Sequence, residues 1–337
     1  TAVVPIEGDP FSEGVFAGAH RLNGNGELTG LEWIREAGVL AGPIGNTNTH
    51  SVGVVRDAIV AAATRSSATA ESAWSLPVVG ETWDGWLNDI DGQHVRAEHL
   101  DAALDAATAG AVAEGNVGGG TGMICHRFKG GIGTASRRLA PDEGGFNVGA
   151  LVQANYGRRE RLAIDGVPVG REIGFDEVPS DRESLAATSS DADAGSIIVV
   201  LATDAPLLPH QCERLAQRAG LGVARTGGAG EHSSGDLFIA FATGNRVGTE
   251  DRTTGRVFER ALRALDDAWI SPLFWAAVEA TEEAIVNALV AAETMAGADG
   301  HVAHRLPHER LKEVWRKHRG LSLIHISEPT RLWSGSR

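Results

Sequence analysis

Gly230-Glu231-His232-Ser233-Ser234-Gly235-Asp236 leads directly into the apolar run Leu237-Phe238-Ile239-Ala240-Phe241. The apolar run predicts a buried strand, and the stretch before it predicts a turn that follows the flexible pair Gly227-Gly228. A hydroxyl residue at the head of a strand, after such a loop, is where a chain can be cut to expose a new amino terminus. Serine-glycine turns before strands are also common, so these residues alone leave an ordinary turn open.

Helical and strand-like patterns alternate on both sides of this stretch. Helical spacing occurs at residues 29–37, 53–63, 94–113, 209–219 and 271–295, and strand-like runs occur at 146–155, 196–203 and 236–242. Residues 176–194 are rich in Asp, Ser and Ala, which is typical of a surface loop or linker. Interleaved helices and strands predict a layered α/β or α+β architecture and not a helical bundle.

The composition is that of a globular protein. The 337 residues are 42% hydrophobic and carry a formal net charge of -14, so a large core is expected and nucleic acid or an anionic membrane is not expected as a partner. No apolar run reaches the roughly 18 residues of a membrane-spanning helix, and we expect a soluble protein. Cys125 and Cys212 have no ligand-like neighbours, which predicts two buried thiols and neither a disulfide framework nor a zinc site.

Both ends of the chain carry unusual sequence. The chain starts at Thr1 without a methionine, so we expect that an N-terminal piece is missing, with or without a signal peptide. A cytoplasmic location is favoured, and a periplasmic one stays open. Residues 321–337 look like translated sequencing adapter and are expected to be a non-native tail, which leaves residues 1–320 as a single domain.

Two further motifs are compatible with ligand sites but favour structural roles. Gly115–Gly122 is rich in glycine and lacks the lysine of a phosphate-binding loop, so a tight turn between two layers is favoured over a nucleotide site. His304 and His308 have the spacing of one helix face, but Pro307 lies between them and favours a surface pair over a metal site. We expect no metal and no organic cofactor.

Short motifs in order along residues 14–318 resemble those of the L-aminopeptidase/D-esterase family, which includes the β-peptidyl aminopeptidases. The motifs are Leu28–Ile34, Asn48–Asp57, Glu81–Asp89, Gly115–Gly122, Phe128–Arg137, Gln153–Gly157, Ala202–Pro209 and Ser234–Asp236. Each one is weak alone, and their shared order carries the resemblance. The resemblance implies an α+β fold, a four-layer αββα sandwich similar to N-terminal-nucleophile hydrolases.

The resemblance also implies that the chain cuts itself. The family's Ser-Gly-Asp corresponds to Ser234-Gly235-Asp236, which places the cut between Ser233 and Ser234 and gives fragments 1–233 and 234–320. Ser234 would then be the nucleophile, and its new α-amine, with a reference pKa near ~8, would be the base that a serine hydroxyl needs. Ser233 stands where relatives typically carry Gly or Asn and is the less suitable nucleophile.

Other roles follow from the resemblance, each beside a plainer interpretation. Tyr156 is expected to donate to the oxyanion, or else to be a core tyrosine. Thr281 and Glu283 form a hydroxyl-x-glutamate step that would assist Ser234, and a surface glutamate pair is the competing interpretation. Glu143 is expected to anchor the substrate amine, unless it is an exposed loop acid.

The resemblance implies a serine aminopeptidase that releases N-terminal residues from short peptides, amides or esters through an acyl-enzyme. It also implies a tetramer of cleaved heterodimers. One alternative is acyl transfer of the ornithine acetyltransferase type, which usually uses threonine where this chain has Ser234. The other is an unprocessed, non-catalytic homologue, which would remain one band on a denaturing gel.

Overall fold

A six-stranded sheet forms the centre of the molecule in the computed structural model, which describes residues 1–66, 74–180, 195–248 and 259–326, with the side chains of the last range described up to residue 319. The strand order is β3-β2-β11-β10-β9-β8. The bounds are β2 Glu13–Arg21, β3 Val39–Ala41, β8 Gly131–Arg138, β9 Asn147–Asn155, β10 Gly195–Thr203 and β11 Ser234–Gly248. β10 and β11 are parallel, and the other neighbours are antiparallel.

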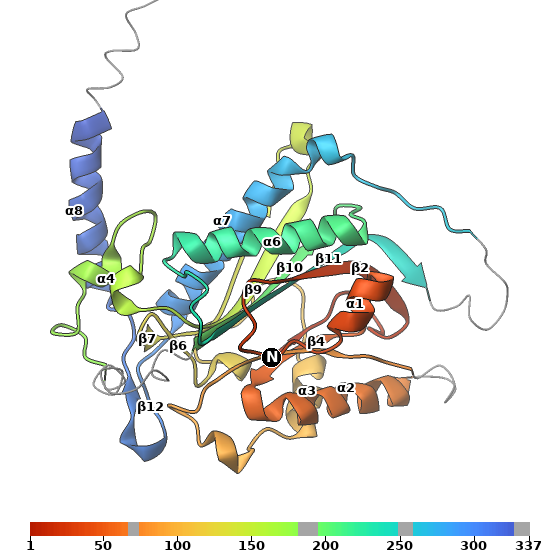
Figure 1. Cartoon of the computed structure of the whole chain (residues 1–337), viewed down its shortest axis with the longest axis horizontal. Helices are drawn as coiled ribbons and strands as arrows, with labels where there is room; N and C mark the ends of the chain where they lie inside the picture. Colours follow the sequence, from red (N-terminus) through yellow and green to blue (C-terminus); the bar gives the residue numbers. More distant parts are fainter. Residues whose placement is uncertain (67–73, 181–194, 249–258, 327–337) are drawn as a thin grey trace, which may run out of the picture.

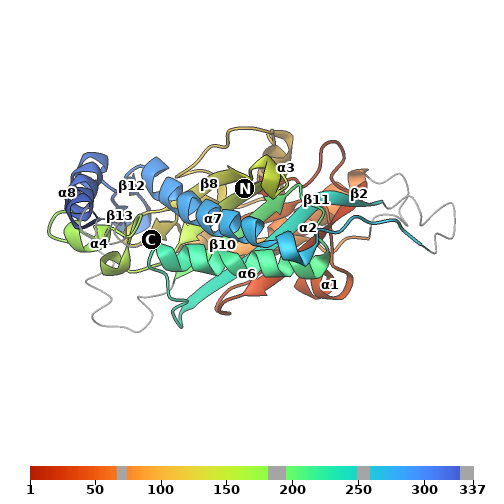
Figure 2. The ribbon, with the colours of Figure 1, turned by 90° about the horizontal axis from the view of Figure 1, so that it is seen from above.

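Two helices, α6 (Pro209–Arg225) and α7 (Ser271–Ala291), lie side by side on one face of this sheet (Figures 1 and 2). Both begin with a proline in the first turn, where its missing N–H costs no helical hydrogen bond. Alternate residues of β11, including Phe238 and Ala240, point toward these helices and join the larger hydrophobic core.

The opposite face of the six-stranded sheet packs on a smaller sheet of order β1-β4-β5, with bounds Ala2–Val3, Ile44–Asn48 and Val78–Thr82. Leu237 and Ile239 of β11 meet Ile44 and Val78 there in a second core. Helices α2 (Val52–Ser66) and α3 (Ala97–Asp105) cover the outer side of the smaller sheet. The layers run helix, sheet, sheet, helix, so the expected four-layer αββα architecture is confirmed.

Further elements lie around this sandwich. They are α1 (Leu31–Ala37), β6 (Ile124–Cys125), β7 (Phe128–Lys129), α4 (Val169–Glu172), β12 (Met295–Ala296), β13 (Val302–Ala303) and α8 (His308–Ile326). One-turn 3₁₀ helices occur at Thr49–Ser51, Ile90–Gly92, Gly118–Gly120, Pro141–Glu143, Arg159–Arg161, Asp267–Trp269 and Ala298–Gly300. None of the helices among the described residues is long and apolar enough to cross a membrane.

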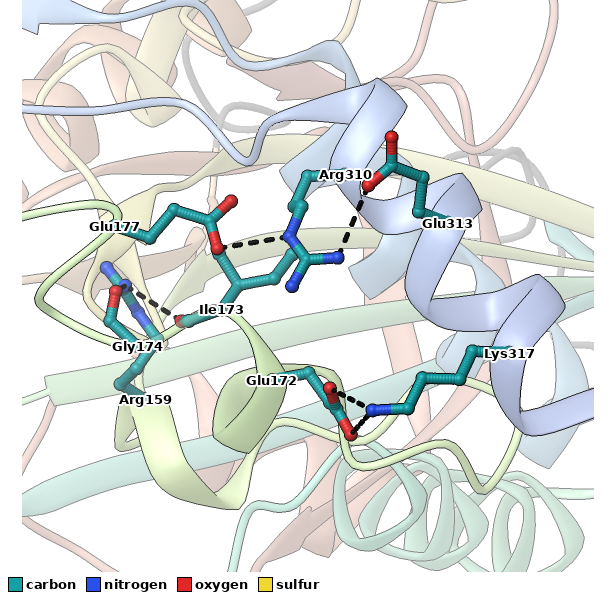
Figure 3. A network of polar contacts seen from close by, with 8 residues as sticks. All are labelled: Arg159, Glu172, Ile173, Gly174, Glu177, Arg310, Glu313 and Lys317. Atoms are coloured by element: carbon teal, nitrogen blue, oxygen red, sulfur yellow. Dashed lines mark hydrogen bonds and ion pairs between the residues drawn. The ribbon is translucent and has the colours of Figure 1, made fainter.

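Helix α8 lies at one end of the molecule and contacts the α4 segment (Figures 1 and 3). Lys317 Nζ and Glu172 Oε2 are 3.0 Å apart, and Arg310 Nε and Glu177 Oε2 are 3.1 Å apart. Helix α8 runs on to residue 326, past the expected domain end at 320, whereas residues 327–337 of the expected tail lie outside the described residues.

One expected segment differs from the structure, and a second lies mostly outside the described residues. The helix expected at 94–113 is present only as α3, which ends at Asp105. Of the loop expected at 176–194, residues 181–194 lie outside the described residues.

Candidate active site

Ser234 is the first residue of β11, the strand between β2 and β10 in the six-stranded sheet. Its side chain points to the same face as Asp236 and Phe238, toward α6 and α7, because side chains alternate along a strand. Ser234 is 4% exposed and Asp236 is 1% exposed. The Ser234 hydroxyl donates to Asp236 Oδ1 at 2.6 Å, so the predicted nucleophile is hydrogen-bonded to a buried carboxylate.

Burial changes the acidity of Asp236. Removal from water disfavours the charged form and raises the pKa of Asp236 to about 6, against the opposing effect of the hydrogen bond from Ser234. The nearby Glu231 carboxylate raises this pKa further. At pH 7 the carboxylate is therefore mostly ionised, while its proton affinity is higher than that of an exposed aspartate.

The peptide bond before Ser234 is contacted by Asn25, from the turn after β2. Asn25 Nδ2 donates to the Ser233 carbonyl oxygen at 2.7 Å, and the Asn25 backbone N–H donates to the Ser234 carbonyl oxygen at 3.2 Å. A Cβ atom on Gly235 would lie 2.4 Å from the Asn25 carbonyl oxygen and 2.6 Å from Gly26 Cα. Glycine is therefore required in the Ser-Gly-Asp motif for the two segments to approach.

Asn23, in the same turn, is hydrogen-bonded to the loop before the Ser-Gly-Asp motif and to the last residue of the motif. Its Nδ2 donates to the Glu231 carbonyl oxygen at 2.7 Å, and its Oδ1 accepts from the Asp236 backbone N–H at 2.7 Å. Neither Asn23 nor Asn25 was among the expected site residues. The Asn-Gly-Asn-Gly sequence indicates only a turn, because the partners of these asparagines are more than 200 positions away in the sequence.

Tyr156 follows β9 and lies two strands from Ser234 on the same face of the sheet. Gly195 of β10 is opposite Ser234 and has no side chain to separate Ser234 from Tyr156. The Tyr156 hydroxyl is hydrogen-bonded to Thr226 Oγ1 at 2.6 Å, at the end of α6, and burial raises its pKa well above the usual value. The structure thus places Tyr156 near Ser234 but pairs its hydroxyl with Thr226.

Thr281 and Glu283 point in different directions from α7. Thr281 is fully buried, and among the described residues its hydroxyl has no hydrogen-bond partner. A Cβ atom on Gly222 would lie 2.6 Å from Thr281 Cβ, so Thr281 packs against the last turns of α6, close to Thr226. Glu283 instead forms an ion pair with Arg137 of β8 at 2.5 Å.

Glu283 and Glu143 both lie apart from Ser234. β8, which carries the partner of Glu283, is three strands from β11, about 14 Å at the usual strand spacing. Glu143 is in the 3₁₀ turn that follows β8, at the end of the sheet opposite to Ser234, and its carboxylate accepts from the Ala140 backbone N–H at 3.4 Å. The structure does not bring either glutamate to Ser234.

The remaining motifs have structural surroundings. A Cβ atom on Gly120 would lie 2.4 Å from the Ile132 backbone nitrogen, in agreement with a tight turn between layers. His308 Nε2 is 2.8 Å from the Val290 carbonyl oxygen, and the described part of the chain has no group of three His, Cys, Asp or Glu residues arranged for a metal. Both cysteines are free and buried, and burial raises the pKa of each thiol to about 12.

Comparisons with known proteins identify the family of the chain. The sequence profile of peptidase family S58 matches residues 1–303. Beta-peptidyl aminopeptidase BapA of Sphingosinicella microcystinivorans is 47% identical over 326 residues, which cover 96% of this chain and 81% of that protein. BapA of Sphingosinicella xenopeptidilytica is 42% identical, with 94% of this chain and 78% of that protein covered.

Solved structures of aminopeptidases are also similar to this chain. A Burkholderia sp. beta-aminopeptidase matches with a TM-score of 0.82 and 53% identity, over 94% of this chain and 85% of that one. The L-aminopeptidase D-Ala-esterase/amidase of Ochrobactrum anthropi, described as a variant of the Ntn hydrolase fold, matches with a TM-score of 0.83 and 43% identity, over 94% and 85% of the two chains. With a buried serine at the head of the central strand and a family match across most of its length, this chain belongs to peptidase family S58.

Proposed function

We propose that this chain is a serine aminopeptidase that cuts itself between Ser233 and Ser234 and then uses Ser234 as its N-terminal nucleophile. The observation that carries the proposal is the contact of the Ser234 hydroxyl with the buried Asp236 carboxylate at the first residue of the central strand. A cut at this point leaves Ser234 anchored in the sheet by its own strand, so the new amino terminus is held in place. This is the position that an N-terminal nucleophile requires.

In turnover, the hydroxyl of Ser234 attacks the carbonyl carbon of the substrate and transfers its proton to a base. After the cut the α-amine of Ser234 is available as that base, with the Asp236 carboxylate beside the hydroxyl. The amine or alcohol leaves with a proton, and water then releases the acyl group from Ser234. This sequence of steps uses no metal and no organic cofactor.

Tyr156 and Thr281 are proposed to support turnover. Tyr156 shares the face of Ser234, and a phenol can donate to the oxyanion once its hydrogen is not given to Thr226. The buried hydroxyl of Thr281, which has no hydrogen-bond partner within the described part of the chain, supports a role for it beside α6. For Glu283 and Glu143 the contacts with Arg137 and Ala140 give no such support.

The substrates are proposed to be short peptides, amides or esters with a free N-terminal amine, and residues with a β-amino group are favoured. The support is that the BapA relatives and the Burkholderia structure carry names of β-aminopeptidases, at 47%, 42% and 53% identity. We also propose that cleaved heterodimers assemble further into a tetramer. β-Alanine and L-alanine p-nitroanilides measure the preference directly.

Intact mass and N-terminal sequencing of the purified protein test the cut. We expect one fragment that ends at Ser233 and one that starts at Ser234. Ser234→Ala should abolish both the cut and the activity because no hydroxyl remains, whereas Ser233→Ala should still be cut. A protein that remains a single chain with full activity would disprove the proposal.

A further inference from the structure

We propose that the uncut chain contains its own self-cleavage centre, in which the Asn25 side-chain amide stabilises the oxyanion at Ser233 and the Asp236 carboxylate is the base for the Ser234 hydroxyl. This inference rests on the proposed cut between Ser233 and Ser234. It assigns the maturation step to two side chains on opposite sides of the bond that breaks.

Asn25 is the side chain that the structure brings to the carbonyl oxygen of the bond to be cut. The donor-acceptor distance of 2.7 Å is that of a good hydrogen bond, and the bond strengthens as the oxygen becomes negatively charged. The turn is fixed independently of this contact by the Asn25 backbone N–H on the Ser234 carbonyl. The side-chain amide is therefore held next to the reacting carbonyl before any reaction occurs.

Tyr156, the expected oxyanion donor, has a different partner in the uncut chain. Its hydroxyl is hydrogen-bonded to Thr226 at 2.6 Å, and the Thr226 hydroxyl donates to the Val223 carbonyl at 2.9 Å. In this arrangement the phenol hydrogen-bonds Thr226 and not the Ser233 carbonyl. On these contacts Asn25 is assigned as the donor for maturation, and Tyr156 remains the proposed donor for turnover.

Asp236 is positioned to accept the proton of the nucleophile. As Ser234 Oγ bonds to the Ser233 carbonyl carbon, the hydroxyl proton passes to Asp236, and the carbonyl oxygen becomes an oxyanion held by Asn25. Asp236 then gives the proton to the Ser234 nitrogen as the carbon–nitrogen bond breaks, which leaves an ester between Ser233 and Ser234. Water hydrolyses the ester, so that Ser233 ends as a carboxylate and Ser234 regains its hydroxyl with a free amine.

The groups around Asp236 are consistent with its role as the base. The charge of Glu231, in the preceding loop, raises the pKa of Asp236. The charge of Asp236 in turn raises the pKa of Tyr156 at the end of β9. Glu231 is itself paired with Arg158 at 3.0 Å. Ser234 Oγ, at 2.6 Å, donates directly to the Asp236 carboxylate.

The test is the rate of self-cleavage, followed in cell-free synthesis by a pulse of radioactive methionine. Met123 and Met295 label the two fragments separately. We expect Asn25→Asp, which keeps the shape but cannot donate, and Asn25→Ala to slow the cut by ~10²-fold, the usual effect of one lost oxyanion donor. Asn147→Ala is the matched control, because it removes a side-chain amide bonded to Asp204 at the far end of the sheet.

Asp236→Asn should also slow the cut by ~10²-fold, the scale of a lost general base. In the unmodified chain the rate should rise as the pH increases through about 6, where Asp236 becomes ionised, and Asp236→Asn should not show this rise. Far-UV circular dichroism and melting temperature confirm that each uncut variant is folded. The inference is overturned if folded Asn25→Asp is cut at the normal rate, or if Asp236→Asn keeps the pH profile, whereas a cut in Ser234→Ala would overturn the proposed function itself.

Discussion

Ser234 and Tyr156 present hydroxyl groups on the same face of the six-stranded sheet, and the two groups have different partners. Ser234 donates to the Asp236 carboxylate, and Tyr156 is bonded to the Thr226 hydroxyl. A carboxylate partner makes the serine oxygen a better nucleophile, whereas a neutral partner leaves the phenol as a donor. The two positions thus match the two roles that acyl transfer needs.

Tyr156→Phe tests the donor role in turnover. If the phenol stabilises the oxyanion, the variant should lose ~10²-fold in kcat with little change in KM, because the interaction is made in the transition state. Thr226→Ala is the matched control, since it removes the partner of the phenol and keeps the phenol itself. If Tyr156 is only a core residue, both variants should instead lose on the order of 1 kcal/mol of unfolding free energy, with normal kcat.

The residues of the site differ in how far the sequence could predict them. Ser234 belongs to a local motif, and the motif predicted its place at the head of a strand. Asn25 was missed because its contact with Ser233 joins positions 208 apart in the sequence. Glu143 and Glu283 were expected near Ser234, but Glu143 lies at the other end of the sheet and Glu283 is paired with Arg137 of β8. Short motifs do not indicate which end or edge of a sheet a residue will occupy.

Among the elements, the apolar ones were predictable and the glycine-rich ones were not. The run before Thr203 predicted β10 to within one residue, whereas β8, with the sequence GIGTASRR, was not predicted as a strand. Glycine is depleted in strands in general, but here it is required by packing. The prediction of a helix at 94–113 was wrong beyond residue 105. Residues 106–113 are exposed, so no packing stabilises their alanine-rich sequence as a helix.

Gly133 of β8 gives a test of this packing between elements. A Cβ atom there would lie 1.9 Å from the Ala284 carbonyl oxygen of α7, so Gly133→Ala must push α7 away from the sheet. We expect a loss of about 1–3 kcal/mol of unfolding free energy and a lower melting temperature. Gly149 of the adjacent strand β9 is the matched control, because nothing lies within 4 Å of a Cβ atom there. Equal melting temperatures for the two alanine variants would show that α7 does not pack closely on β8.

In the whole molecule, the proposed cut gives two fragments that are no longer covalently joined but still pack against each other. β11 starts at the cut, and both of its neighbours, β2 and β10, belong to the fragment that ends at Ser233. α7 follows β11 in the sequence and packs on α6 and β8, which are also in the first fragment. The two fragments therefore share one sheet, one helix layer and one hydrophobic core.

This topology predicts that the two fragments do not separate after cleavage. Separating them would break the strand ladders on both sides of β11 and expose the core between α6 and α7, at a cost comparable to unfolding the whole domain. The cleaved protein should elute from a sizing column at the same volume as uncut Ser234→Ala, and should show two bands only on a denaturing gel. In increasing urea, dissociation, loss of activity and loss of circular dichroism should share one midpoint. Fragments that separate on the native column, or that dissociate well before secondary structure is lost, would mean that β11 is not held between β2 and β10 in the mature protein.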